Sequence, residues 1–280
     1  MKKKILSGIL AVALTCTLSA CGAPASSQAD TSSESDRPTV LRVGASPTPH
    51  AEILNAVNDL LLDQYNVQLE VVEYSDYVVP NTAVEEGEDQ ANYFQHTPYL
   101  DTFNAENGTH LVSVAKIHYE PFGLYSQTVS DLADLPDGAK IAIPNDGSNE
   151  ARALYLLEDQ GLITLNHDAG FQATVLDITS NPKNIQFEEV AAEMVARTLD
   201  DVDGAIVNGN YALTAGLKIE DAIATESASS EAAQTYANIV VVEQGHENDA
   251  AVQALVEALT SDTARDFITN TYHGAVVPLF

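Results

Sequence analysis

The segment from Tyr74 to Leu100 has the sequence YSDYVVPNTAVEEGEDQANYFQHTPYL, and the rest of the chain is organised around it. It concentrates ring-bearing side chains between two stretches typical of regular structure. They are Tyr77, Tyr93, Phe94, His96 and Tyr99, in a chain with only 7 Phe, 11 Tyr and no Trp. Most aromatic side chains fill hydrophobic cores. A loop context favours the other interpretation, an apolar pocket that carries a few polar groups.

Two prolines define that loop context. Pro80 and Pro98 each stand where a helix can begin, and Thr97 is expected to cap the second helix. Phe94 and His96 are therefore expected on a short strand-to-helix connection. Connections of this kind often carry the ligand contacts of α/β proteins.

Strands and helices alternate along the whole chain. Strands are expected at residues 39–44, 67–73, 91–94, 110–117, 123–126, 140–143, 173–178, 184–190, 204–207 and 239–242. Helices are expected at about residues 51–65, 98–106, 148–160, 191–199, 249–259 and 261–272, with shorter ones beginning at Pro80 and Ser130. Ser148 is expected to cap the helix at 148–160, and Gly108 and Gly161 to end helices. The alternation predicts an α/β fold with largely parallel sheets, in two lobes with a ligand cleft between them.

The first 20 residues are predicted to be a signal peptide. Three lysines at positions 2–4 precede an apolar run at residues 5–18 that is too short for a comfortable membrane span. The sequence Leu-Ser-Ala-Cys at residues 18–21 resembles a bacterial lipobox, which implies cleavage before Cys21 and lipid attachment to it. Residues 21–38 are rich in Ser, Ala and Asp and are expected to form a flexible tether. A plain signal peptide with a chance cysteine is the alternative.

Composition limits the kinds of function. Cys16, the other cysteine, lies in the signal peptide, so neither a disulfide nor a cysteine metal site is expected in the mature chain. Removing the three N-terminal lysines leaves 9 of the 12 basic residues against 41 acidic ones, a net charge of −32. Such an acidic surface argues against nucleic acid and against direct adhesion to anionic lipid.

Arg152 is the first candidate for ligand recognition. It follows a predicted strand near a helix N-terminus, where its guanidinium can hold a carboxylate in a bidentate pair. A surface salt bridge to one of the many acidic residues is an equally good interpretation. Asn149, Asn208 and Asn238 each stand at the end of a predicted element. Their amides can bind ammonium and carboxylate groups, although turn formation is the commoner use of Asn.

No pattern in the sequence predicts catalysis, a cofactor or a metal. His96 can be a ligand contact, a metal ligand or a satisfied core histidine, but it has no HxxxH or HExxH spacing. The chain also lacks a GxSxG elbow, a Walker loop and a GxGxxG motif.

Longer motifs point to a family. They are VGASPTPHAEIL at 43–54, SDYVVPN at 75–81, ANYFQHTPYL at 91–100, YEPFGLYS at 119–126, IPNDGSNEARAL at 143–154, SNPKN at 180–184 and GAVVP at 274–278. With them the chain resembles the methionine-binding lipoproteins of bacterial ABC importers, the NlpA group of substrate-binding proteins, over residues 39–280. The segment at 188–197 departs from the group, with Glu193 and Ala196 where many members have proline.

The resemblance implies a two-lobed, periplasmic-binding-protein-like fold of type II that closes on an amino acid. It implies that the thioether side chain is surrounded by Tyr77, Phe94, His96 and Tyr99. It also implies that Arg152 grips the α-carboxylate and that Asn149, Asn208 and Asn238 supply amide contacts. The expected lobes are residues 39–124 plus 238–280, and residues 125–237.

We therefore expect a lipid-anchored protein on the extracytoplasmic side of the cell membrane. It would capture L-methionine and deliver it to an ABC permease and its ATPase, with no cofactor and no chemistry of its own. D-methionine, methionine sulfoxide or a short methionine-containing peptide are alternative ligands. A lipid-anchored hydrolase using His96 or His50, and a surface adhesion protein, are alternatives of other classes.

Overall fold

The computed structural model describes residues 37–226 and 231–280. The predicted signal peptide, the lipidation of Cys21 and nearly all of the predicted tether lie outside the described residues. Within those two ranges, none of the helices has the length and hydropathy that a membrane crossing requires.

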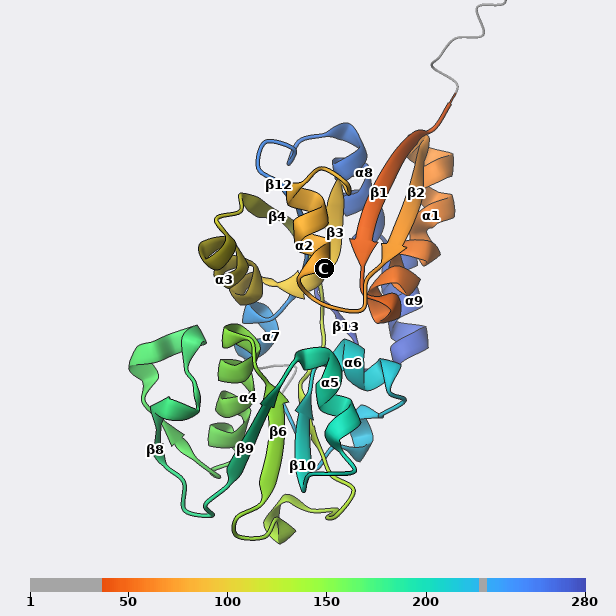
Figure 1. Ribbon diagram of the computed structural model, residues 1–280. Helices are drawn as coiled ribbons and strands as arrows, with labels where there is room; N and C mark the ends of the chain where they lie inside the picture. Colours follow the sequence, from red (N-terminus) through yellow and green to blue (C-terminus); the bar gives the residue numbers. More distant parts are fainter. Residues whose placement is uncertain (1–36, 227–230) are drawn as a thin grey trace, which may run out of the picture. The chain divides into compact units, whose positions relative to one another are not determined.

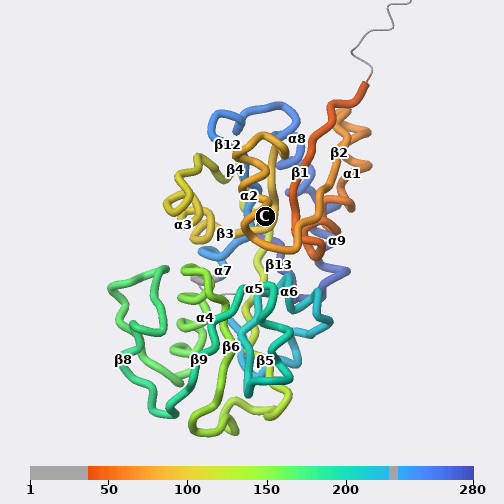
Figure 2. Tube along the Cα trace, viewed as in Figure 1, coloured from red at the N-terminus to blue at the C-terminus, as the bar shows by residue number. Residues whose placement is uncertain are grey.

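A six-stranded sheet forms the centre of the first lobe (Figure 1). In order across the sheet, its strands are β13 (Val277–Pro278), β4 (Leu111–Tyr119), β12 (Asn238–Glu243), β3 (Ala91–His96), β1 (Thr39–Ala45) and β2 (Val67–Glu73). β1 runs parallel to both β2 and β3, whereas β12 runs antiparallel to its neighbours β3 and β4. Figure 2 shows blue β12 among the orange and yellow segments, because it joins this sheet from late in the chain.

A five-stranded sheet forms the centre of the second lobe. In order, its strands are β11 (Ala224–Thr225), β5 (Gly123–Tyr125), β10 (Gly204–Val207), β6 (Lys140–Pro144) and β9 (Gln186–Val190). β6 is parallel to β9 and β10, and β5 is antiparallel to β10. A separate antiparallel pair consists of β7 (Thr164–Leu165) and β8 (Ile178–Ser180).

The prediction of largely parallel sheets is wrong, because each sheet is mixed. Each contains three parallel strands followed by an antiparallel strand that is the first to form after the chain crosses from the other sheet, β12 in one case and β5 in the other. The chain passes between the sheets at residues 120–122 and again between β11 and β12. A strand that enters this way has no helical crossover to turn it parallel. The first passage lies just before the expected lobe limit at 124.

Helices cover both faces of each sheet. They are α1 (Glu52–Tyr65), α2 (Val79–Glu85), α3 (Thr97–Asn107), α4 (Gly147–Asp159), α5 (Ala192–Val195), α6 (Gly209–Thr214), α7 (Glu231–Thr235), α8 (Ala250–Leu259) and α9 (Asp262–Tyr272). Short helical turns occupy Pro47–Ala51, Leu132–Asp134, His167–Gln172, Val175–Asp177, Ala196–Thr198 and Ile219–Asp221. In the first lobe, α1, α8 and α9 share one hydrophobic core with the sheet, and α2 and α3 share another. In the second lobe, α4 packs on one side and α5 with α6 on the other.

The start of α3 differs from the expectation and moves two side chains of the candidate site. His96, not Thr97, is the N-cap, and its side chain accepts a hydrogen bond from the backbone N–H of Tyr99. β3 therefore continues to His96, so that Phe94 lies within the strand and not on a loop. The expected end of the helix is confirmed, because Gly108 has a left-handed backbone with φ of 69°.

The start of α4 also differs. Its N-cap is Asp146, whose carboxylate accepts the backbone N–H of Asn149 at 3.0 Å, and Ser148 lies inside the first turn. A carboxylate is a good cap here, since the helix dipole favours negative charge at this end. In the same way, Asp131 and not Ser130 caps the short turn at Leu132–Asp134.

The strand expected at residues 173–178 does not form. Thr174 and Asp177 instead make a capping box around a single helical turn, and only Ile178 of that range belongs to a strand. Side chains that bond their neighbouring backbone compete with sheet formation, and here they outweigh the β-branched residues. The helix expected at 191–199 is confirmed only in part, as α5 followed by a 3₁₀ turn.

Candidate ligand-binding site

A cavity with an empty volume of about 320 Å³ lies between side chains of both lobes. All eight residues that the sequence analysis associates with ligand line it: Tyr77, Phe94, His96, Tyr99, Asn149, Arg152, Asn208 and Asn238. Its other lining residues are Gln95, Glu120, Phe122, Gly209 and Asn210. The structure thus brings the whole set together, and its role in binding remains a prediction.

Strand ends and helix starts supply the polar members of the set. His96 ends β3, and Asn238 begins the neighbouring strand β12. From the other lobe, Asn149 and Arg152 lie in the first two turns of α4, and Asn208 is the N-cap of α6. Ligands of α/β proteins commonly bind outside strand ends of this kind, which is why residues far apart in the sequence meet here.

Aromatic rings form one wall of the cavity. The ring centroid of Tyr77 lies 5.6 Å from those of Phe94 and Tyr99, within the range of attractive aromatic pairs. Tyr211 of α6 does not line the cavity but packs against this wall, with its ring centroid 5.0 Å from that of Tyr77. Tyr93 does not belong to it. Successive side chains of a strand alternate in direction, so Tyr93 is buried in the core on the opposite face of β3.

Hydrogen bonds hold this wall together across the two lobes. The hydroxyl of Tyr77 donates to Oδ1 of Asn210 at 2.6 Å, and that of Tyr211 donates to the carbonyl of Ser75 at 3.1 Å. Within the first lobe, the Tyr99 hydroxyl donates to the carbonyl of Tyr77 at 3.0 Å. The loop that carries Tyr77 is therefore fixed against α6.

Arg152 makes a buried ion pair rather than a surface one, since its side chain is only 3% exposed. Its Nε and Nη2 atoms donate to the two carboxylate oxygens of Glu226 at 2.9 and 2.6 Å, and Nη2 also donates to the main-chain carbonyl of Glu120. The guanidinium lies 3.9 Å from the ring centroid of Phe122 and 4.3 Å from that of Tyr236. Burial lowers the pKa of Arg152, but Glu226 more than compensates and raises it above its usual value. Among the described residues, Nη1 has no hydrogen-bond partner, so it is the nitrogen that remains for a ligand.

The amides of Asn149 and Asn208 form a connected pair. Nδ2 of Asn149 donates to the carboxylate of Asp146, and its Oδ1 accepts from Nε2 of His96 at 3.1 Å and from Nδ2 of Asn208 at 3.0 Å. Oδ1 of Asn208 is buried and has no hydrogen-bond partner among the described residues. A buried acceptor without a hydrogen bond is unfavourable in free energy, so an N–H group of a ligand would be favoured at this oxygen.

His96 combines two of the roles considered for it. It is a satisfied buried histidine, because Nδ1 accepts from the backbone of Tyr99 and Nε2 donates to Asn149. It also lines the cavity. Burial, with a smaller contribution from Arg152, lowers the pKa of His96 to about 3, so the ring is neutral.

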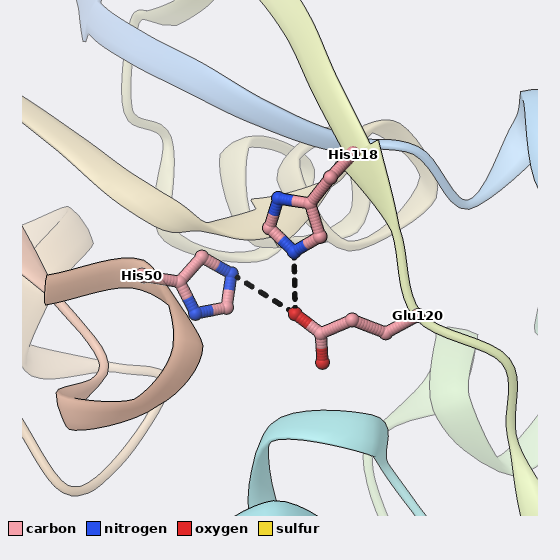
Figure 3. A group of neighbouring side chains, drawn as sticks. All are labelled: His50, His118 and Glu120. Atoms are coloured by element: carbon pink, nitrogen blue, oxygen red, sulfur yellow. Dashed lines mark hydrogen bonds and ion pairs between the residues drawn. The ribbon is translucent and has the colours of Figure 1, made fainter. Parts of the chain in front are cut away.

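Glu120 is the main polar residue of the cavity that the sequence analysis did not single out, although it lies in the motif YEPFGLYS. It follows β4 directly, and Figure 3 shows His50 and His118 converging on one of its carboxylate oxygens. These three side chains are buried, and their ligating atoms lie within 4.8 Å of one another. No spacing in the sequence signals the group, because the short helical turn at Pro47–Ala51 brings in His50 from about 70 residues away.

Comparisons with known proteins agree with this architecture. The methionine-binding lipoprotein MetQ of Bacillus subtilis is 40% identical over 283 residues, covering 99% of each chain. A nutrient-binding protein from Burkholderia cenocepacia, solved bound to methionine, has a TM-score of 0.82 and 41% identity, covering 86% of this chain and 100% of that one. A periplasmic substrate-binding protein of an ABC transporter from Coxiella burnetii has a TM-score of 0.81 and 39% identity, covering 85% and 100%.

The two mixed sheets and the cavity between them define the class as a two-lobed, periplasmic-binding-protein-like fold. The profile of the NlpA lipoproteins matches residues 41–280, nearly all of the described chain. The chain belongs to the NlpA lipoprotein family.

Proposed function

We propose that this protein captures L-methionine and delivers it to an ABC permease and its ATPase. The observation that carries the proposal is the division of one cavity into an aromatic end and a polar end. The names of relatives that bind methionine or serve an ABC transporter give independent support.

The aromatic end suits a thioether. Tyr77, Phe94 and Tyr99 offer ring faces and edges, and sulfur makes favourable contacts with aromatic rings. Burying an apolar side chain of this size contributes roughly 1.5–3 kcal/mol.

The polar end suits an amino acid zwitterion. The Nη1 atom of Arg152 can donate to a carboxylate, and Oδ1 of Asn208 can accept from an ammonium group. Both partners are needed, because a desolvated charge without one is strongly unfavourable.

D-methionine, methionine sulfoxide and a short methionine-containing peptide are the rival ligands, because each could set a side chain against the aromatic end and a charged group at the polar end of the same cavity.

The cavity gives the hydrolase alternative no support. Its lining, as far as the described residues define it, contains no Ser, Thr, Cys or Lys to act as a nucleophile. His96 is engaged at both ring nitrogens, and burial lowers the pKa of His50 to about 4. We propose capture and release without chemistry.

We further propose a lipid at Cys21, a tether beyond it, and exposure on the extracytoplasmic side of the membrane. The two lobes, residues 39–124 plus 238–280 and residues 125–237, would move apart to admit the ligand. The lipoprotein names of the family and of a relative support the anchor.

The test is to purify the protein without ligand exchange, denature it, and identify the released small molecule by mass spectrometry. Calorimetric titration of the refolded protein then compares L-methionine, D-methionine, methionine sulfoxide and a methionine-containing dipeptide. L-methionine should be released and should bind most tightly. Release of another compound, or tighter binding of one of the other ligands, would reassign the substrate.

A further inference from the structure

Two tyrosine hydroxyls join the lobes beside the cavity. The hydroxyl of Tyr211 donates to the main-chain carbonyl of Ser75 at 3.1 Å, and that of Tyr77 donates to Oδ1 of Asn210 at 2.6 Å. Ser75 and Tyr77 lie on the connection between β2 and α2 in the first lobe, whereas Asn210 and Tyr211 belong to α6 in the second. The rings of Tyr77 and Tyr211 also pack together, with centroids 5.0 Å apart. We refer to these four residues as the interlobe latch, because the lobes cannot separate here without losing all three contacts.

The connection between β2 and α2 is held firmly to the first lobe. The backbone N–H of Tyr74 donates to the carbonyl of Ala45 at 2.9 Å, and its hydroxyl donates to Oδ2 of Asp89 at 3.0 Å. On the other side of Ser75, the carboxylate of Asp76 accepts the backbone N–H groups two and three residues further on, at 2.8 and 2.9 Å. The carbonyl of Ser75 therefore cannot follow α6 when the lobes move apart.

Tyr211 is held just as firmly by the second lobe. Its side chain is buried in a hydrophobic core with Ala142 of β6 and Ala205 of β10. Burial raises the pKa of Tyr211 above its usual value, so its hydroxyl stays protonated and remains a donor. Because packed parts of this kind move as rigid bodies, the latch is either made or broken.

The bond between Tyr211 and Ser75 is separate from the cavity. Neither residue lines it, although Tyr77 does. A second hydrogen bond between the lobes, from Nε2 of Gln172 to Oγ1 of Thr102 at 3.2 Å, also lies away from the cavity, but it is exposed. Water competes for an exposed bond of this kind, so the partly buried bond of Tyr211 contributes more to the closed state.

We propose that the interlobe latch sets how long the closed protein retains its ligand, and that Tyr211 acts as a positioning residue that does not touch the ligand. The inference rests on the proposed function and deepens it, since it separates the residues that hold the lobes closed from those that line the cavity. A bond made only in the closed state raises the apparent affinity by stabilising that state. The ligand enters while the lobes are apart, so the latch slows dissociation and leaves association unchanged.

The rival interpretation makes Tyr211 a core residue of the second lobe and nothing more. Tyr211→Phe separates the two, because it removes the hydroxyl and keeps the buried ring. Tyr155→Phe is the matched control. The Tyr155 hydroxyl donates to the carbonyl of Gly170 at 3.0 Å, which is the same kind of bond with both partners in the second lobe. Each variant therefore loses one bond from a tyrosine hydroxyl to a carbonyl, but only one of these bonds joins the lobes.

The experiment measures the release of isotopically labelled L-methionine during a chase with excess unlabelled methionine. Calorimetry gives the affinity, and the two measurements together give the association rate. Tyr211→Phe should release methionine about two- to twelve-fold faster than the wild type, the usual net effect of one hydrogen bond, with association unchanged within about two-fold. Tyr155→Phe should release it at the wild-type rate. An unchanged release rate in Tyr211→Phe, or an equal acceleration in Tyr155→Phe, would overturn the inference while the proposed function stands. Failure of the wild type to bind methionine would overturn both.

Tyr77→Phe tests the other bond of the latch. It removes the hydroxyl that donates to Asn210 and keeps the ring that lines the cavity. Release of methionine should be faster in this variant too, and faster again when it is combined with Tyr211→Phe. If Tyr77→Phe releases methionine at the wild-type rate, the two bonds do not act together and the latch is refuted.

A double-mutant cycle with Phe94→Ala distinguishes closure from a change in the aromatic wall. Tyr211→Phe keeps the ring that packs against Tyr77, so it should accelerate release by the same factor in the wild type and in Phe94→Ala. Factors that differ by more than about three-fold would show that Tyr211 acts through the wall around the ligand, contrary to the inference.

Discussion

Replacement of Arg152 by alanine tests the carboxylate end of the proposed site. The protein has only 12 basic residues, and the side chain of Arg152 is buried. One of its nitrogens, Nη1, has no hydrogen-bond partner among the described residues. If that nitrogen holds the carboxylate of methionine, its removal should weaken methionine binding. Methionine amide, which has no carboxylate, should bind poorly to the wild type and should be affected much less.

The expected magnitude follows from the occupancy of the guanidinium. Truncating one member of a buried charge pair typically costs about 2–5 kcal/mol. Glu226 already occupies Nε and Nη2, so the ligand carboxylate meets one nitrogen and not a bidentate fork. The lower part of the range is therefore expected, about 2–3 kcal/mol, or about 30- to 150-fold in affinity. Arg152→Lys should recover only part of the loss, since its ammonium cannot also keep the geometry of the ion pair with Glu226.

The internal ion pair requires a control. Burial raises the pKa of Glu226, but Arg152 and other hydrogen bonds hold it below its usual value, so Arg152→Ala leaves a buried carboxylate without its partner. Such a break can cost about 3–5 kcal/mol of folding stability. The double variant Arg152→Met, Glu226→Gln removes both charges and keeps similar volumes, so it should fold more stably than Arg152→Ala.

Calorimetric titration of methionine and methionine amide against the wild type, Arg152→Ala and the double variant completes the test. Methionine should lose about 30-fold or more in both variants, while its amide changes by only a few-fold. If methionine loses no more than its amide, the guanidinium and the ligand carboxylate are not coupled. Arg152 would then serve only to pair with Glu226.

Three further outcomes are expected. Phe94→Ala should weaken methionine binding by about 1–3 kcal/mol in a folded protein, because it removes a wall of the aromatic end, and wild-type affinity would remove Phe94 from the site. Cys21→Ser should release the protein from the membrane fraction, and full retention would contradict lipidation. The pKa values of His50, His96 and His118 are lowered to about 4, 3 and 3, so the unfolded chain binds more protons below pH 6.5. Stability should therefore fall from pH 6.5 toward pH 4, by up to about 1.4 kcal/mol per pH unit for each histidine. The raised pKa values of the Glu120, Asp146 and Glu150 carboxyl groups offset part of this loss. Thermal unfolding across this range measures the net effect, and a midpoint that rises from pH 6.5 to pH 4 would contradict the prediction.

Local patterns predicted most of the fold. β2 and β10 occupy the expected residues, and the start and end of α8 and α9 differ by one residue or less. The direction of strands was not predictable from those patterns. Periodicity shows that β12 is buried, but it does not show that the strand crosses from the other lobe and pairs between β3 and β4.

The candidate site was predictable where residues stand at element ends. Asn208 and Asn238 were identified on that basis, and both line the cavity. The partner of Arg152 was not predictable, because Glu226 is 74 residues away in an acidic chain that offers many candidates. His50 was considered only as a possible catalytic residue, since nothing near it in sequence reveals the carboxylate that it meets in the fold.

The position of β12 has a consequence for how the chain reaches its native state during synthesis. β3 and β4 are not neighbours in their sheet, because residues 238–243 lie between them. The N-terminal 119 residues contain β1, β2, β3 and β4, but they lack β12, the strand that pairs with both β3 and β4. All strands of the five-stranded sheet have been synthesised once residue 225 has left the ribosome. The first lobe, whose strands begin earlier in the chain, is therefore completed after the second. Until then β3 and β4 present unpaired edges, which are hazards for aggregation. A nascent chain stalled before residue 238 should therefore be sensitive to protease in its first lobe and resistant in its second.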